Sequence, residues 1–218
     1  MAQKFHQIRK CLKPTCAFRF PNPLFSEQYI FCPKCGSPTV IVETPYSGMV
    51  VEKEQGKTAL HIEVLLDNIR SAHNVGSIIR TSDGIGVSHL HFCGITPTPD
   101  HPKVIKTALA AEQHIPWTQH WNSPDAGKSL IDGGLQLIAL EGGEDAAPIF
   151  DFISTPQFQP IVLILGNEVS GVDPGLLSLC SQKIWLPMLG KKQSFNVSVA
   201  FGIAAYIIRF AENFKSNP

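Results

Sequence analysis

Five short apolar segments recur along residues 60–218, and they constrain the fold more than any other feature of the chain. They are Ile62–Ile69, Leu90–Cys93, Leu135–Leu140, Ile161–Leu165 and Lys183–Leu186. Each has the length of a buried strand, and the segments between them are long enough for helices. This alternation predicts an α/β fold with a parallel sheet covered on both faces. Ligands of such folds bind where strands end, so we expect functional residues in the loops that follow the strands.

Four cysteines near the N-terminus form a separate pattern. They occur as Cys11-x4-Cys16 and Cys32-x2-Cys35, with fifteen residues between the two pairs. This spacing suits one tetrahedral zinc ion with four thiolate ligands. Unliganded thiols and a redox dithiol at Cys32 and Cys35 are the alternatives. We therefore expect residues 1–44 to form a small zinc-ribbon module.

The two patterns predict two structural units in the 218 residues. We expect the zinc ribbon at 1–44, a linker at 45–59 and the α/β domain at 60–218. Apolar residues make up 44% of the chain and charged residues 17%, which is enough to build a core and argues against disorder. Cys93 and Cys180 lie in apolar segments, and we interpret both as buried packing residues.

Charge gives weak support for a nucleic-acid partner. Lys+Arg and Asp+Glu both total 18, so the whole chain has no basic field. Residues 1–36, however, contain six lysines and arginines against Glu27 alone. A zinc ion with four thiolates would lower this surplus by two, leaving enough positive charge to attract phosphate. A purely structural clip or a protein-docking surface remains the alternative for this module.

No apolar segment is long enough to cross a membrane. The longest, Val197–Ile208, is too short, and no N-terminal run resembles the apolar core of a signal peptide. We expect a cytoplasmic protein, or one inside an organelle, with no membrane partner.

Three polar loops follow strands in the predicted α/β domain. The first leads into a helix whose start we place at Asn74, the second is bracketed by glycines and carries Glu168, and the third precedes the last helix. In the third loop, Ser194, Asn196 and Ser198 are candidates to cap that helix. The chain has no GxGxxG after a strand, no complete P-loop, and neither HExxH nor GxSxG, so it lacks the signatures of several common enzyme classes.

Taken in order, the three loops closely resemble the three motifs of the SpoU/TrmH-type RNA methyltransferases of the SPOUT superfamily. The matching segments are Asn74-x-Gly76-x3-Arg80, Gly166-Asn167-Glu168-x2-Gly171, and Leu186-Pro187-Met188-x-Gly190-x3-Ser194-Phe195-Asn196. The resemblance extends from about Leu60 to the C-terminus. It implies a SPOUT-type parallel sheet whose C-terminal segment forms a deep trefoil knot, and it implies a homodimer.

The resemblance also implies a site. It places S-adenosylmethionine in the knot, and by position it assigns the cofactor to Leu140, Gly142, Gly166, Asn167, Leu186, Met188 and Phe195. Phe195 stands where leucine is common in the family. The catalytic residues that it implies are Arg80, Asn74, Glu168, Ser194 and Asn196. Arg80 has been viewed as the base in this family, but a guanidinium is rarely neutral. We expect Arg80 to bind phosphate and to stabilise developing charge instead.

The expected function is therefore methyl transfer from S-adenosylmethionine to a ribose 2'-hydroxyl of tRNA or rRNA. A catalytically silent RNA-binding or assembly factor and an RNA base methyltransferase of the same fold are the alternatives. The motifs do not distinguish tRNA from rRNA, and they do not identify the target nucleotide or the proton acceptor.

Overall fold

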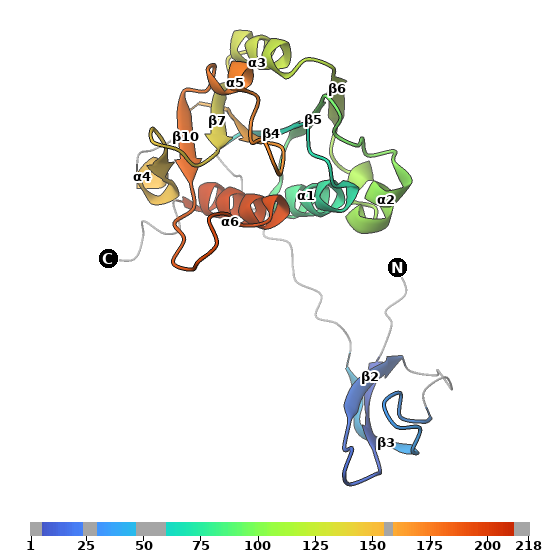
Figure 1. Cartoon of the computed structure of the whole chain (residues 1–218). Coiled ribbons are helices and arrows are strands. Elements are labelled where there is room, and N and C mark those ends of the chain that lie inside the picture. Colours follow the sequence, from blue (N-terminus) through green and yellow to red (C-terminus); the bar gives the residue numbers. More distant parts are fainter. Residues whose placement is uncertain (1–5, 24–29, 47–59, 155–158, 212–218) are drawn as a thin grey trace. The chain divides into compact units, whose positions relative to one another are not determined.

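A computed structural model shows two compact units, Met1–Gly56 and Lys57–Pro218 (Figure 1). It describes residues 6–23, 30–46, 60–154 and 159–211. Most of the expected linker lies outside these residues, and the expected domain ranges stay a prediction. Within the described residues, no helix is long and apolar enough to cross a membrane.

The N-terminal unit is a three-stranded antiparallel sheet in the order β2-β1-β3. Its strands are β1 (His6–Cys11), β2 (Arg19–Pro23) and β3 (Thr39–Tyr46). The first pair of cysteines lies at the end of β1 and in the turn that follows, and the second pair lies in the turn before β3. The sheet therefore brings two cysteine-bearing turns to one end of this small unit.

The second unit contains a seven-stranded sheet in the order β6-β5-β4-β9-β7-β10-β8, and its paired strands run parallel. The strands are β4 (Ile62–Asp67), β5 (His89–Cys93), β6 (Trp117–His120), β7 (Gln136–Leu140), β8 (Ala147–Pro148), β9 (Ile161–Leu165) and β10 (Gln182–Trp185). β10 lies between β7 and β8, two strands that precede it in the chain. The knot itself stays a prediction of the family resemblance.

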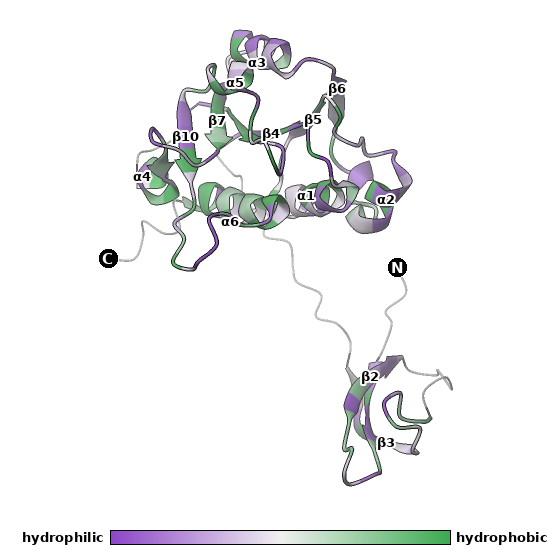
Figure 2. Cartoon of the chain, in the orientation of Figure 1, coloured by the Kyte–Doolittle hydropathy of each residue, from purple (hydrophilic) through white to green (hydrophobic). Residues whose placement is uncertain are grey.

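Helices cover both faces of this sheet (Figure 1). They are α1 (Ala72–Ile85), α2 (Pro102–Ala108), α3 (Ser123–Asp132), α4 (Ile149–Ser154), α5 (Pro174–Leu177) and α6 (Val197–Arg209), with a 3-10 turn, η2 (Ala111–Gln113), after α2. On one face, Ile78 of α1 and Phe201 of α6 pack against alternate residues of the central strands. On the other, Ala126 of α3 and Leu176 of α5 pack against the intervening residues. Figure 2 shows the hydrophobic character of β7 and much of α6.

The predicted parallel α/β sheet is confirmed, and each of the five expected apolar segments overlaps a strand. Two strands were missed, for different reasons. β6 lies at the exposed edge of the sheet and is polar except for Trp117, and β8 has only two residues. Neither forms the continuous apolar run that identifies a strand buried on both faces.

The expected start of the first long helix at Asn74 is wrong. Ser71 is the N-cap of α1, and its side chain accepts a hydrogen bond from the backbone N–H of Asn74 at 3.3 Å. Asn74 therefore lies inside the first turn, where its amide group is free for other contacts. Asn196 does cap α6 as expected, because its side chain accepts a hydrogen bond from the N–H of Ser198 at 3.0 Å.

Candidate functional site

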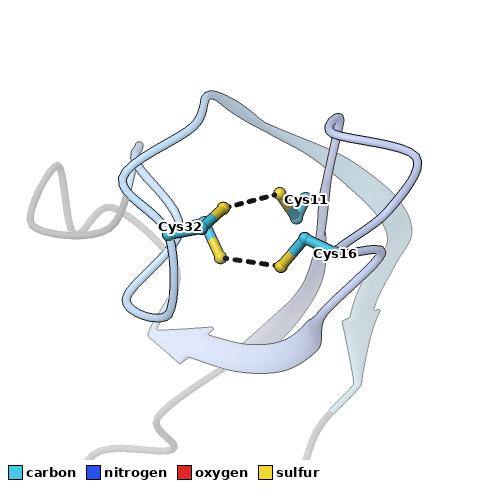
Figure 3. A group of neighbouring side chains, drawn as sticks. Cys11, Cys16 and Cys32 are labelled. Carbon is cyan, nitrogen blue, oxygen red and sulfur yellow. Dashed lines mark hydrogen bonds between the residues drawn. The ribbon is translucent and has the colours of Figure 1, made fainter.

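The four N-terminal cysteines converge on one point. Their sulfur atoms all lie within 4.8 Å of one another. The Sγ atoms of Cys11 and Cys35 are 3.5 Å apart, and those of Cys16 and Cys32 are 3.9 Å apart. Figure 3 shows the side chains of Cys11 and Cys16 on one side and of Cys32 on the other, all pointing toward a common centre. None of these cysteines forms a disulfide.

This arrangement fits a zinc ion. Tetrahedral zinc with Zn–S bonds of about 2.3 Å separates its sulfur ligands by roughly 3.8 Å, and the Cys11–Cys35 and Cys16–Cys32 sulfur separations lie on either side of that value. Gly36 has a φ of +70° directly after the second pair, so the turn needs a residue without a Cβ there. The spacing in the sequence thus corresponds to a donor set of the right kind and size.

The two remaining cysteines are separate from this cluster. Burial raises the pKa of the Cys93 thiol to about 12 and that of Cys180 to about 11. Both pack in the core on the α3 and α5 side of the sheet. Because the thiolate is the reactive form, these cysteines are inert packing residues, as their apolar surroundings in the sequence indicated.

A cavity of about 440 Å³ lies at the carboxyl ends of β7, β9 and β10. All seven residues expected to hold the cofactor line it, and so do Glu168, Ser194 and Asn196. The further lining residues are Glu141, Leu165, Val169, Gly171, Ile184, Trp185, Gln193, Val197 and Ala200. Its volume lies within the roughly 300–1,000 Å³ of small-ligand sites.

A chain of hydrogen bonds joins the three motif loops beside this cavity. The side-chain amide of Asn74 donates to the Glu168 carboxylate at 2.9 Å. The oxygen of the same amide accepts a hydrogen bond from the Asn196 side chain at 3.1 Å. Glu168 follows β9, Asn74 lies in the first turn of α1, and Asn196 caps α6. The buried side chain of Asn74 therefore couples three segments that are distant in the sequence.

Glu168 is held in its ionised form. Burial opposes the charge, but hydrogen bonds from the backbone N–H of Arg70, the Asn74 side chain and the backbone N–H of Ser71 outweigh burial and lower its pKa. The backbone donors lie 2.9 Å and 3.2 Å from the carboxylate, at the N-terminus of α1. A carboxylate that is satisfied in this way is a poor proton acceptor and a good anchor for the loop after β9.

The two glycines of the second motif are needed by the loop itself. A Cβ on Gly166 would lie 2.3 Å from the backbone of Gly171 and Val172. Gly171 has a φ of +75°, and its Cβ would lie 2.9 Å from the Glu141 carboxylate. The close neighbours of both glycines are thus protein atoms. Asn167 completes the loop by donating to the carbonyl of Asn68 at 2.7 Å.

Arg80 lies outside the cavity lining. It is exposed and one turn after Gly76, on the side of α1 that packs against α2. Among the described residues, its guanidinium group has no hydrogen bond or ion pair. The structure therefore places Glu168, Ser194 and Asn196 in the cavity lining, with Asn74 bonded to Glu168 and Asn196 behind it, and leaves the charge of Arg80 available to a partner.

The cavity lining contains two carboxyl groups and no lysine, arginine or histidine. Glu141 was missed by the sequence reasoning, although it directly follows Leu140, which was included. Its carboxylate accepts a hydrogen bond from the backbone N–H of Val172 at 3.2 Å. The position after a predicted strand was the signal that could have identified it.

Comparison with known proteins decides the family. The model of the SpoU rRNA Methylase family matches residues 61–206, which contain the whole cavity lining. This chain belongs to the SpoU rRNA Methylase family. Among its SpoU relatives, the tRNA (guanosine(18)-2'-O)-methyltransferase of Escherichia coli (strain K12) is 30% identical over 145 residues. That match covers 66% of this chain and 61% of the relative, so the chain spans less than two thirds of that protein.

Two matches from Aquifex aeolicus cover more of the relative's own length. The tRNA (guanosine(18)-2'-O)-methyltransferase of Aquifex aeolicus (strain VF5) is 30% identical, with 72% of this chain and 71% of that protein covered. The crystal structure of the A. aeolicus TrmH/SpoU tRNA modifying enzyme has a TM-score of 0.62 at 27% identity, covering 73% of this chain and 78% of that one. An AdoMet-bound rRNA methyltransferase from Sinorhizobium meliloti has a TM-score of 0.62 at 25% identity, with 72% and 57% covered.

Proposed function

We propose that this protein transfers a methyl group from S-adenosylmethionine to a ribose 2'-hydroxyl of RNA. The charge of the cavity carries this proposal. A lining with Glu141 and Glu168 but no basic residue favours a cationic ligand such as a sulfonium compound, and it disfavours cofactors with phosphate groups. Membership of the SpoU family and its AdoMet-bound relative support the same cofactor.

The residues of the cavity fit this cofactor in a second respect. Leu140, Leu186, Met188 and Phe195 supply an apolar surface suited to an adenine ring, and the loops around them offer backbone polar groups. When bound, the cofactor supplies an electrophilic methyl group. The protein then has to orient the ribose hydroxyl and assist removal of its proton. The Glu168–Asn74–Asn196 chain holds the three loops in place for this task.

Arg80 is proposed to bind the RNA beside the reacting ribose. Its exposed guanidinium group, which has no partner among the residues that the structure describes, is suited to a phosphate, and it stabilises negative charge that develops on the ribose oxygen. The proton acceptor is therefore a group other than Arg80 or the well-satisfied Glu168. tRNA and rRNA are both within the scope of this proposal.

A structural zinc ion at Cys11, Cys16, Cys32 and Cys35 is part of the proposal. The convergence of the four sulfur atoms supports it. In the reducing cytoplasm, where we propose that the protein acts, such a cluster is stabilised by metal rather than by disulfides.

We also propose that the protein is a homodimer that buries one face of α6. Val199, Ile203 and Tyr206 follow one another at helical spacing on this face, and all are exposed. α6 carries no charged residue before Arg209, so its outward face is apolar as well as its buried one. A helix that is apolar all round is normally buried, which supports a second copy as the cover.

The role of Arg80 is tested with Arg80→Ala. We expect the rate of methyl transfer to RNA to fall by about 100-fold or more, because a charge that stabilises the transition state is removed. The affinity for S-adenosylmethionine, measured by calorimetry, should stay within about twofold, since Arg80 does not line the cavity. Lys128→Ala on α3 is the matched control and should leave both quantities unchanged. An unchanged rate in Arg80→Ala would remove this residue from the reaction.

A further inference from the structure

One face of the N-terminal sheet carries a row of exposed side chains that the zinc site does not explain. Lys10 pairs with Arg19 of β2 and with Val40 of β3. Residues opposite each other in antiparallel strands point to the same side of the sheet, so these three share a face.

The row extends toward the cysteine-bearing turns. The N–H of Leu12 donates to the carbonyl of Pro38 at 3.0 Å, and Pro38 also pairs with Phe31. Leu12 is two residues after Lys10, and Pro38 is two residues before Val40. Because side chains alternate along an extended chain, Leu12 and Pro38 lie on the same face as Lys10 and Val40. Phe31 lies on this face as well, because it pairs with Pro38. We call the resulting surface the ribbon face, and it consists of Lys10, Leu12, Arg19, Phe31, Pro38 and Val40.

The ribbon face is apolar at its centre and cationic around it. Phe31 is 61% exposed and Leu12 is 58% exposed. Exposed Lys13 and Lys34 lie in the two cysteine-bearing turns, one residue after Leu12 and three residues after Phe31 in the sequence. Glu43 lies beside this face and contacts Arg19 at 2.8 Å. The face therefore stays cationic even beside the two negative charges of a four-thiolate zinc centre.

The zinc ion does not need this surface. The sulfur atom of Cys11 points to the opposite side of β1, since Cys11 pairs with buried Thr39. A small unit that keeps a phenylalanine and a leucine in water gains no stability from them, so the exposed pair indicates a ligand. An aromatic surface flanked by cations suits a polymer that alternates flat bases with phosphates.

We propose that the ribbon face binds single-stranded RNA, with a base stacked on Phe31 and phosphates on Lys10 and the lysines of the two turns. This inference rests on the proposed function, and it assigns to the N-terminal unit a share of substrate binding. Because both units belong to one chain, RNA held by the ribbon face has a raised effective concentration at the methyltransferase unit. Binding there depends on base stacking and on charge, and it selects unpaired nucleotides.

The test measures the affinity of the zinc-loaded full chain for a fluorescently labelled 12-nucleotide oligouridine. Phe31→Ala should weaken binding by about tenfold, because a stacking contact is lost. Lys10→Gln should reduce the slope of log affinity against log salt by about 0.7, the value for one phosphate contact on a single strand. Ile41→Ala is the matched control, because Ile41 follows Val40 on β3, pairs with Arg9 on the opposite side of the sheet and is also exposed. It should stay within about twofold of the unmodified protein.

Zinc content and cofactor affinity show that each variant is folded, so a loss of RNA binding is attributable to the face. Wild-type affinity in both Phe31→Ala and Lys10→Gln would overturn the proposal and leave protein docking as the role of this surface. Equal losses for a 12-base-pair duplex would overturn it as well, because stacking on Phe31 needs an unpaired base. Methyl transfer by the unmodified chain is assayed in parallel. Its absence would refute the proposed function while the binding result stands.

Discussion

Outside the cavity, Glu63 is a carboxyl group whose pKa is shifted by two neighbouring histidines. Glu63 of β4 accepts hydrogen bonds from His61 and His91, each at 2.8 Å, and its side chain is only 14% exposed. The hydrogen bond from His91 makes the largest contribution to the pKa of Glu63. Burial raises this pKa, but the hydrogen bonds from His91 and His61 together outweigh burial and lower it to about 2. A carboxyl group with an ordinary pKa in the unfolded chain therefore stabilises the fold when it ionises.

Substitution of Glu63 tests this coupling. Above a pH of about 4.5, the unfolded value, Glu63→Gln should lower the free energy of unfolding by up to about 3 kcal/mol. The difference from the unmodified protein should shrink as the pH falls from 4.5 toward 2, because the native carboxylate is then protonated as well. Urea unfolding across this range measures it. Asp125→Asn, which removes an exposed ion pair with Lys128, should cost less than about 1 kcal/mol at any pH. A pH-independent difference for Glu63→Gln would contradict the assignment.

Asn74 shows what the sequence reveals about a residue and what it conceals. Its motif identified it as part of the site, and its place beside Glu168 supports that choice. Its local role was predicted wrongly, because an asparagine before an apolar run is also a good helix cap. Ser71 competes for that position and occupies it. The partners of Asn74 are 94 and 122 residues away, so no local pattern indicates them.

At the scale of elements, the loop after β9 depends on close packing of its own backbone. Gly166→Ala places a methyl group against Gly171 and Val172, and we expect it to destabilise the protein by at least about 2 kcal/mol through overpacking. Gly142→Ala is the matched control, because Gly142 lines the same cavity and has open space around it. Its free energy of unfolding should change by less than about 0.5 kcal/mol. Equal stabilities of the two variants would show that the loop adapts.

The exposed face of α6 makes a prediction about assembly. Ile203→Asp places a charge on this face and should convert the proposed dimer into a monomer, because an unpaired charge is costly to bury. Light scattering after gel filtration measures the mass. Ile131→Asp on α3 is the control, since Ile131 is 40% exposed and Ile203 is 37% exposed. A monomeric unmodified protein, or a dimer that survives Ile203→Asp, would refute this interface.

At the scale of the whole molecule, most of the architecture was predictable. Apolar runs located the five strands that are buried in the sheet, and cysteine spacing located the cluster in the N-terminal unit. β6 escaped because an edge strand needs no apolar pattern. The position of β10 between β7 and β8 was not predicted either, because periodicity contains no information about which strands become neighbours. Family resemblance supplied the cofactor residues, and the cavity brings all seven together.

The central claim is ribose methylation of RNA, and nucleoside mass spectrometry tests it most directly. The zinc-loaded protein is incubated with labelled S-adenosylmethionine and RNA that lacks this enzyme's modification, and the RNA is then digested to nucleosides. We predict that the label appears in 2'-O-methylated nucleosides, and that Arg80→Ala lowers its rate of appearance by about 100-fold or more. Label on a base, or no transfer to either tRNA or rRNA, would contradict the account.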